Sequence, residues 1–259
     1  MDKIKPLKRF GQNYLVDKNI IEKIISEFNP QPDDTVLEIG PGQGALTSCL
    51  AQKVKKLLAV EIDKRVIDDL TSRFPDVEFI NNDFLKMDLH SLIPSRKRVI
   101  GNIPYYITSP IIFKLIEERE TILDAMLMTQ LEVAQRIVAK PRTKDYGILS
   151  VIVNFFAESK LCFKISPNVF FPKPKVESAI IHFRFDKKIR DDVDNKLFMK
   201  VVKASFGNRR KTLKNSLSNG GFSEIDFASL DFDFTRRAEE LTIDDFVILT
   251  NLIDNKLTG

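Results

Sequence analysis

The chain has 259 residues, of which 43% are hydrophobic and 29% charged, and its formal net charge is +4. This composition predicts a globular protein of one or two domains, and the lack of an apolar run of about 18 residues argues against a membrane-spanning chain. Two distant cysteines and only two histidines argue against a disulfide framework, a metal site and a histidine-based triad, so we expect a cytoplasmic protein without a metal.

Short apolar runs alternate with helix-like spacing of apolar residues through the first 186 residues. This alternation predicts an α/β fold, in which helices cover both faces of a parallel sheet. Strands are expected at 35–39, 57–62, 77–80, 98–103 and 124–130, and helices at 18–28, 45–54, 64–73, 109–118 and 131–140. Two later runs, 161–165 and 177–185, are expected to close the sheet edge as an antiparallel pair.

The pattern changes near residue 186, after which short helical segments dominate. We therefore expect a larger first domain, 1–186, and a smaller helical domain, 187–259. The helices expected in the second domain are 194–206, 208–218, 223–229 and 242–254, with Gly220 and Gly221 forming a break between two of them.

Charge is unevenly distributed along this second domain. Residues 187–215 carry ten Lys or Arg and three Asp, whereas residues 216–259 carry three Lys or Arg and nine Asp or Glu. A basic segment followed by an acidic one predicts a surface that faces a polyanion on one side. A solvated helix face without a partner is the alternative interpretation.

The first predicted strand runs into a glycine turn, VLEIGPGQGALT. Gly40, Gly42 and Gly44 allow the backbone to approach a ligand closely, although they could also serve turn geometry alone. The spacing from Gly40 to Ala45 also fits a relaxed dinucleotide fingerprint. Glu61 ends the second predicted strand, where a carboxylate can bind both ribose hydroxyls of an adenosyl ligand. Dinucleotides and S-adenosylmethionine both satisfy this pattern.

Two further segments favour S-adenosylmethionine. Asp83 follows the third predicted strand, where it can bind an adenine amino group, although an Asp at such a position is also a common helix N-cap. The fourth predicted strand ends in Asn102-Ile103-Pro104-Tyr105, a set for which a nicotinamide enzyme has no use. Because an open α/β sheet binds ligands at the carboxyl ends of its strands, all these residues are expected at one rim.

The segment at 102–105 suits an adenine whose amino group is to be methylated. That amine is a poor nucleophile, because its lone pair is delocalised into the ring. The side-chain oxygen of Asn102 and the carbonyl of Ile103 or Pro104 can each accept a hydrogen bond from it, which favours a pyramidal nitrogen. Tyr105 offers a ring face on which an extruded base can stack. No metal is required, and catalysis would consist mainly of positioning.

Six segments carry a resemblance to a known family: KRFGQNYL, VLEIGPGQGALT, AVEID, NIPYYITSP, FFPKPKVESA and FGNRRKTLKNSL. In this order, and over nearly the whole chain, they resemble the ribosomal RNA adenine dimethyltransferases of the small subunit. The resemblance implies a Rossmann-like S-adenosylmethionine-dependent methyltransferase domain followed by a helical domain that binds RNA or the ribosome. It also implies methyl transfer to N6 of two adjacent adenosines in the 3′-terminal hairpin of small-subunit (16S) rRNA, giving N6,N6-dimethyladenosines during subunit biogenesis.

The resemblance also assigns roles to individual residues. Contacts to the donor, S-adenosylmethionine, are expected at Asn13, Leu15, Gly40, Glu61, Asp83 and Asn102. Catalysis is expected at Asn102, Pro104 and Tyr105, stacking on the target base at Tyr105 and Phe171, and RNA binding at Arg209, Arg210, Lys211 and Lys214. The expected partner is the small ribosomal subunit with its rRNA, and the expected state is a monomer. One departure is Tyr14, which stands where the family more often has Phe.

Three other functions remain open from the sequence. A resistance-type methylase that modifies an adenine of large-subunit rRNA has a nearly identical catalytic domain, but FGNRRKTLKNSL and NIPYYIT favour the small-subunit enzyme. A non-catalytic assembly or transcription factor could keep the fold, although the intact set from Asn102 to Tyr105 argues against it. A DNA amino-methylating enzyme more often has Pro at the position of Ile103.

Overall fold

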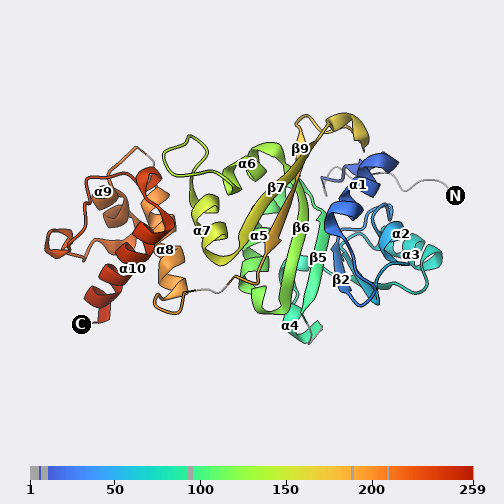
Figure 1. The fold of residues 1–259 in the computed structure, drawn as a ribbon, viewed down its shortest axis with the longest axis horizontal. Helices are drawn as coiled ribbons and strands as arrows, with labels where there is room; N and C mark the ends of the chain where they lie inside the picture. Colours follow the sequence, from blue (N-terminus) through green and yellow to red (C-terminus); the bar gives the residue numbers. More distant parts are fainter. Residues whose placement is uncertain (1–5, 7–10, 93–95, 188–189, 209, 259) are drawn as a thin grey trace. The chain divides into compact units, whose positions relative to one another are not determined.

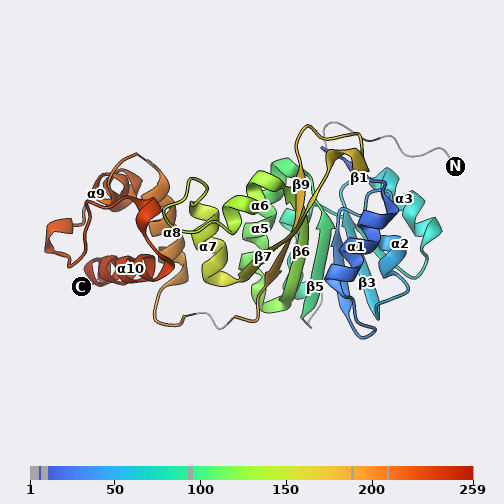
Figure 2. The ribbon, with the colours of Figure 1, turned by 45° about the horizontal axis from the view of Figure 1, so that its top comes forward.

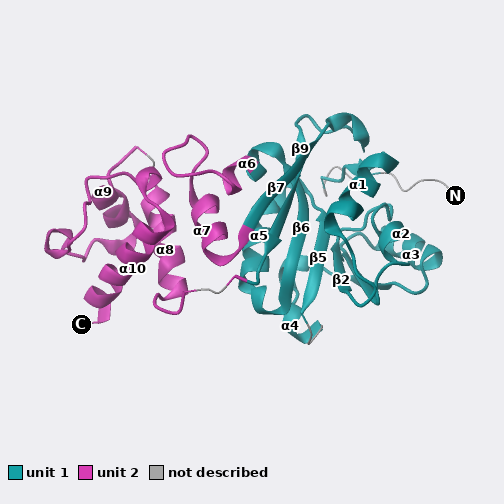
Figure 3. Ribbon diagram, in the orientation of Figure 1, with its two compact units in different colours: residues 1–134, 159–186 teal, residues 135–158, 187–259 magenta. Residues whose placement is uncertain are grey.

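The computed structural model describes residues 6, 11–92, 96–187, 190–208 and 210–258. The chain divides into two compact units, each continuous in space although not in sequence (Figure 3). The first unit consists of residues 1–134 and 159–186, and the second consists of residues 135–158 and 187–259. Within the described residues, no helix is long and apolar enough to cross a membrane.

A seven-stranded sheet forms the centre of the first unit, in the order β4-β3-β2-β5-β6-β9-β7 (Figure 1). Neighbouring strands from β4 to β6 run parallel, and β9 is antiparallel to β6. The strands are β2 Thr35–Ile39, β3 Lys56–Glu61, β4 Glu78–Asn81, β5 Lys97–Asn102, β6 Ile122–Gln130, β7 Glu158–Ile165 and β9 Ser178–Arg184. The predicted α/β fold is confirmed, and the two late strands are neighbours at the sheet edge as expected.

Alternate residues of the strands pack against helices on opposite faces of the sheet. Val36 and Ile100 share one core with Ile24 and Phe28 of α1. On the other face lies α5, whose buried residues include Leu115 (Figures 1 and 2). The helices of this unit are α1 Lys18–Phe28, α2 Thr47–Leu50, α3 Lys64–Arg73, α4 Leu89–Leu92 and α5 Thr108–Glu117. α2 is shorter than the helix expected at 45–54, and α4 was not expected.

A second, two-stranded sheet joins the N-terminal arm to a late loop. β1 Tyr14–Leu15 pairs antiparallel with β8 Phe170–Phe171, so that Tyr14 lies opposite Phe171. The amide of Val16 donates a further hydrogen bond to the carbonyl of Val169, at 2.9 Å. Two-residue strands are too short to show a period of two, which is why the sequence did not reveal this pairing.

The second unit is helical and includes a segment that the sequence analysis assigned to the first domain. Its residues 135–158 contain α7, in which Phe155 stacks on Phe198 of α8 with ring centroids 4.0 Å apart. α7 was not predicted, because seven of its nine residues are apolar, and a short run of this kind does not distinguish a buried helix from a buried strand. The remaining helices of the chain are α6 Leu131–Ile137, α7 Ile148–Phe156, α8 Asn195–Phe206, α9 Leu213–Leu217 and α10 Ile243–Thr258.

Two predicted helices of the second unit are shorter than expected. The helix predicted at 208–218 begins only at Leu213, and the one predicted at 223–229 is reduced to a 3-10 turn over Phe227–Ser229, capped by the side chain of Asp226. The predicted break at Gly220 and Gly221 is confirmed, since Gly221 has a φ of +94°, in the left-handed region that favours glycine.

Candidate active site

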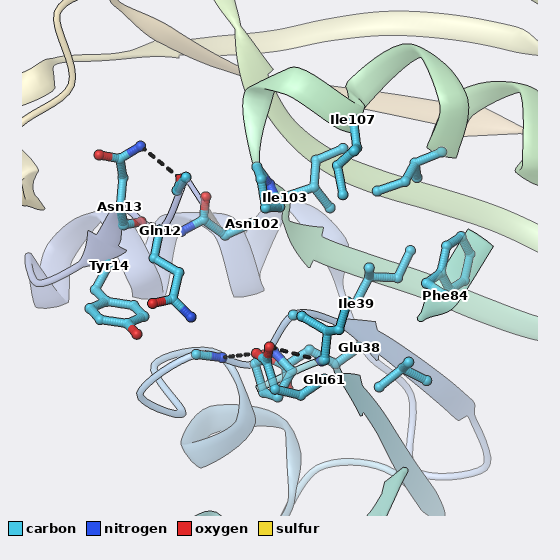
Figure 4. A pocket seen from close by; sticks show the side chains of 18 of the residues that line it. Gln12, Asn13, Tyr14, Glu38, Ile39, Glu61, Phe84, Asn102, Ile103 and Ile107 are labelled. Atoms are coloured by element: carbon cyan, nitrogen blue, oxygen red, sulfur yellow. Dashed lines mark hydrogen bonds between the residues drawn. The ribbon is translucent and has the colours of Figure 1, made fainter. Parts of the chain in front are cut away.

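A cavity of about 270 Å³ lies at the carboxyl ends of β2, β3, β4 and β5 in the first unit (Figure 4). Its wall combines residues of the N-terminal arm, 11–15, with the glycine turn within 38–46 and the segments 60–62, 82–85 and 102–107. The predicted site residues that line it are Asn13, Leu15, Gly40, Glu61, Asp83, Asn102, Pro104 and Tyr105. Segments far apart in the sequence therefore meet at the rim where a ligand was expected.

The glycine turn follows β2 and needs glycine for its backbone conformation. Gly40 has a φ of +68° and Gly42 a φ of +56°, and the amide of Gly40 donates to the carbonyl of Val60 at 2.9 Å. A Cβ on Gly42 would lie 3.0 Å from two ring carbons of Tyr14. The glycines thus serve turn geometry and also allow the arm to pack closely onto the turn.

Glu61 places a buried carboxylate at the end of β3. Its Oε1 accepts hydrogen bonds from the amides of Ile62 and Asp63, both at 3.0 Å, and its Oε2 accepts a longer one of 3.4 Å from Gly42. Burial raises the pKa of Glu61, against the effect of these backbone donors. Because each carboxylate oxygen can accept two hydrogen bonds, Glu61 keeps the capacity to bind a ligand hydroxyl.

A second buried carboxylate, Glu38, lines the same cavity and was not singled out from the sequence. Its Oε2 accepts a hydrogen bond of 2.6 Å from the hydroxyl of Thr47. Burial raises the pKa of Glu38 to about 7. The sequence feature that could have identified Glu38 is a charged residue inside the buried strand TVLEI, which runs into the glycine turn.

Asp83 has a structural role in addition to its place at the cavity. Its Oδ1 accepts a hydrogen bond of 3.1 Å from the amide of Leu85 and so caps a 3-10 turn over Phe84–Lys86. The N-cap interpretation is therefore correct, and it is compatible with a ligand contact because capping uses only one of the two carboxylate oxygens.

Asn102 ends β5 and is held by the arm. Its Nδ2 donates a hydrogen bond of 2.9 Å to the carbonyl of Asn13, which leaves Oδ1 as the acceptor of the side chain. The preceding Gly101 lets β5 run close to β2, since a Cβ at that position would lie 2.7 Å from the carbonyl oxygen of Ile39. Gly101 was not identified from the sequence, and only strand packing explains it.

Pro104 and Tyr105 follow in a rigid turn. The carbonyl of Pro104 accepts a hydrogen bond of 3.2 Å from the amide of Ile107, which closes a 3-10 turn over Tyr105–Ile107. The hydroxyl of Tyr105 lies 2.6 Å from Oγ of Ser178, a fully buried residue at the start of β9. Burial raises the pKa of Tyr105. The phenol is thus anchored at its hydroxyl end, and the half-buried Tyr105 is one of the residues that line the cavity.

The other predicted residues lie outside the cavity lining. Phe171 is 62% exposed and contributes to the β1–β8 pair. Arg210, Lys211 and Lys214 are exposed in the second unit, around the start of α9, and Arg209 lies outside the described residues. Across the residues that the structure describes, no group of three or more His, Cys, Asp or Glu is arranged to hold a metal ion.

The sequence is similar along its length to one protein family and to named relatives. The family model for "Ribosomal RNA adenine dimethylase" matches residues 3–255. A protein of Alkaliphilus oremlandii named "Ribosomal RNA small subunit methyltransferase A" is 42% identical, over 96% of this chain and 92% of its own length. A protein of Chlorobium phaeobacteroides with the same name is 46% identical, over 92% of this chain and 88% of its own.

Two solved structures share the fold over almost the whole chain. A dimethyladenosine transferase from Plasmodium falciparum superposes with a TM-score of 0.77 at 26% identity, covering 95% of this chain and 98% of its own. The 23S rRNA methyltransferase ErmE superposes with a TM-score of 0.68 at 29% identity, covering 93% of this chain and 100% of its own.

Proposed function

Because the chain belongs to the ribosomal RNA adenine dimethylase family, we propose that it methylates two adjacent adenosines in the 3′-terminal hairpin of small-subunit rRNA. The methyl groups come from S-adenosylmethionine and are transferred to N6, giving N6,N6-dimethyladenosines during subunit biogenesis. The observation that carries the proposal is the convergence of Glu61, Asp83, Asn102 and Tyr105 on one cavity.

The cavity fits an adenosyl methyl donor, which supplies a methyl group on a positively charged sulfur. Glu61 binds the ribose hydroxyls through the lone pairs that its backbone donors leave free, and Asp83 binds the adenine amino group. The remaining donor contacts are assigned to Asn13, Leu15, Gly40 and Asn102. The glycine turn supports this assignment, because Gly40 and Gly42 present backbone rather than side chains to the cavity.

The target adenine is bound between the end of β5 and the turn that follows it. Oδ1 of Asn102 accepts a hydrogen bond from the N6 amine, and the carbonyl of Pro104 accepts the second through the lone pair that Ile107 leaves free. Both bonds favour a pyramidal nitrogen with its lone pair directed at the methyl carbon. Tyr105 stacks on one face of the base, and Phe171 covers it from the other.

The small subunit is proposed as the partner because the relatives at 42% and 46% identity are both named as small-subunit methyltransferases. The exposed basic residues of the second unit, Arg210, Lys211 and Lys214, bind its rRNA together with Arg209. In this proposal the first domain carries catalysis and the second binds the ribosome. The enzyme acts in the cytoplasm as a monomer and uses no metal.

Methylation of large-subunit rRNA is the second candidate, because the fold is also shared with the 23S rRNA methyltransferase ErmE. The two candidates differ in which subunit accepts label. Purified protein would be incubated with labelled S-adenosylmethionine and with under-methylated small or large subunits separately, and the nucleosides analysed by mass spectrometry. We expect dimethyladenosine in the small subunit, with monomethyladenosine only as a transient. Label in the large subunit, or monomethyladenosine alone at long times, would contradict the proposal.

A further inference from the structure

Tyr106 is an exposed aromatic residue at the mouth of the cavity whose role the site described above does not explain. Tyr106 is one of the residues that line the cavity and yet is 64% exposed, whereas the neighbouring Tyr105 is half-buried. Tyrosine is enriched at binding interfaces, because its ring is apolar and its hydroxyl is polar, so an accessible Tyr beside a binding cavity is a candidate contact for the ligand.

The two tyrosines point in different directions because they are successive residues of one 3-10 turn. With three residues per turn, consecutive side chains are about 120° apart around the axis. Tyr105 is directed inward, where its hydroxyl meets Oγ of Ser178 at 2.6 Å. Tyr106 is consequently turned outward at the edge of the same cavity.

The ring of Tyr106 also packs against the N-terminal arm on one side. A Cβ on Gly11 would lie 3.3 Å from both Cδ1 and Cε1 of this ring, and the φ of +58° at Gly11 favours glycine. The arm therefore supports one edge of the ring and leaves the rest accessible. A ring that already packs against backbone on one edge loses less conformational entropy when a flat ligand stacks on it than a ring without such a contact.

We propose that Tyr106 stacks on the base next to the target adenosine and so holds the second substrate base outside the cavity while the first reacts. The inference rests on the proposed function, in which the two substrate adenosines are adjacent. When one base is extruded onto Tyr105, its neighbour loses a stacking partner and remains at the mouth of the cavity. An aromatic ring supplies a replacement surface there without reading the sequence, because every base has a π face.

A purely structural role for Tyr106 would give a different response to mutation. If the ring only supported Gly11 and the arm, its loss would loosen the arm that lines the donor cavity. Donor affinity would then fall, and the effect would not depend on the base beside the target. If the ring binds that base, its loss should matter only when the base is present.

The test is a cycle that removes the ring, the base, or both. Small subunits would be reconstituted with rRNA in which one of the two adenosines is replaced by an abasic residue, and methylation of the other would be measured. For intact rRNA we expect Tyr106→Ala to lower kcat/KM by about 5- to 150-fold, the range of one lost stacking contact. For at least one of the two abasic rRNAs, the kcat/KM values of Tyr106→Ala and of the wild type should differ by less than twofold.

Three controls accompany the cycle. Tyr106→Phe keeps the ring and should stay close to wild type. Leu123→Ala changes a 41% exposed position near the start of β6 and should leave kcat/KM unchanged on every rRNA. Calorimetry with S-adenosylhomocysteine should give equal affinities for all variants, which also shows that they are folded.

The outcomes separate this inference from the proposed function. If Tyr106→Ala lowered kcat/KM equally on intact rRNA and on both abasic rRNAs, the stacking role of Tyr106 would be overturned. Weakened binding of S-adenosylhomocysteine by Tyr106→Ala would also overturn it. Failure of the wild-type protein to methylate intact small subunits would instead overturn the proposed function itself.

Discussion

The side-chain amide of Asn102 donates a hydrogen bond of 2.9 Å to the backbone carbonyl of Asn13, 89 residues earlier in the chain. This bond fixes the orientation of the Asn102 amide, because Nδ2 is directed at the arm and Oδ1 remains as the acceptor of the side chain. It also joins the N-terminal arm to the end of β5. In the proposed reaction the arm therefore orients Asn102 as well as lining the cavity.

Replacing Asn102 should affect the reaction more than binding. We expect Asn102→Ala to lower the methylation rate at saturating donor by about 100-fold or more, because an acceptor aimed at the reacting amine is lost. Affinity for small subunits should change by less than about twofold, since phosphate contacts elsewhere dominate it. Asn102→Asp should be at least as impaired, because a carboxylate cannot donate to the Asn13 carbonyl. A variant that keeps more than a tenth of the rate would rule out this role.

Replacing Glu61 should separate ligand binding from stability. We expect Glu61→Gln to bind S-adenosylmethionine about tenfold more weakly in calorimetry, because charge-assisted hydrogen bonds become neutral ones. Burial raises the pKa of Glu61, so its stabilising contribution is present at low pH and is lost as pH rises through the folded-state value. The unfolding free energy of the variant relative to wild type should therefore increase as pH rises above the unfolded-state pKa of about 4.3. Glu117→Gln, at an exposed position of α5, should show neither effect.

Among the described residues, the buried hydroxyl of Tyr14 has no hydrogen-bond partner, and burial raises the pKa of this phenol to about 12. Tyr14→Phe keeps the ring against Gly42 and removes the unsatisfied group. We expect the variant to be more stable by about 1 kcal/mol in denaturant unfolding, with unchanged donor affinity. Tyr146→Phe is the matched control, because the hydroxyl of Tyr146 donates a hydrogen bond of 2.7 Å to the carbonyl of Leu241. Loss of that bond should lower the free energy of unfolding. Weaker donor binding by Tyr14→Phe would show instead that the hydroxyl contacts the ligand.

Asp124 should make the first unit sensitive to acid. Burial alone would raise the pKa of Asp124, but hydrogen bonds from Arg98 and His182, both at 2.7 Å to Oδ2, lower it below its usual range. The stabilisation is therefore complete above the unfolded-state pKa of about 3.9 and is lost as pH falls through the folded-state value. At pH 7 we expect Asp124→Asn to lower the free energy of unfolding in urea by about 3 kcal/mol. This difference between the variant and the wild type should shrink below about pH 4. A difference independent of pH would contradict this assignment.

The basic residues at the start of α9 should control the salt dependence of RNA binding. Each phosphate contact contributes about 0.7–0.9 to the slope of log affinity against log salt concentration. Changing Arg210, Lys211 and Lys214 together to Gln should reduce that slope by about 2 while leaving donor binding intact.

A matched set of exposed lysines provides the control for this experiment. Lys53, Lys55 and Lys56 lie before or at the start of β3, at the end of the strand opposite the cavity. Their replacement by Gln should leave the slope unchanged. If both triple variants behave like wild type, the basic segment is a solvated helix face rather than an RNA contact.

The sequence by itself determined the layout of the sheet and the rim at which a ligand binds. Alternating strand and helix patterns predict parallel strands, and the carboxyl ends of parallel strands share one edge of a sheet. Glu61, Asp83 and Asn102 each sit at or just after the end of a strand, so their convergence on one cavity follows from local patterns alone.

Only the tertiary structure decided how the remaining parts of the site are assembled. The arm reaches Asn102 because β1 pairs with β8, and α7 belongs to the second unit because Phe155 stacks on Phe198. Gly101 is required by the closeness of Ile39 in the neighbouring strand, and Tyr106 is held by Gly11. These contacts join residues far apart in the chain, and a local pattern records the preferences of a segment but not the partner against which it packs.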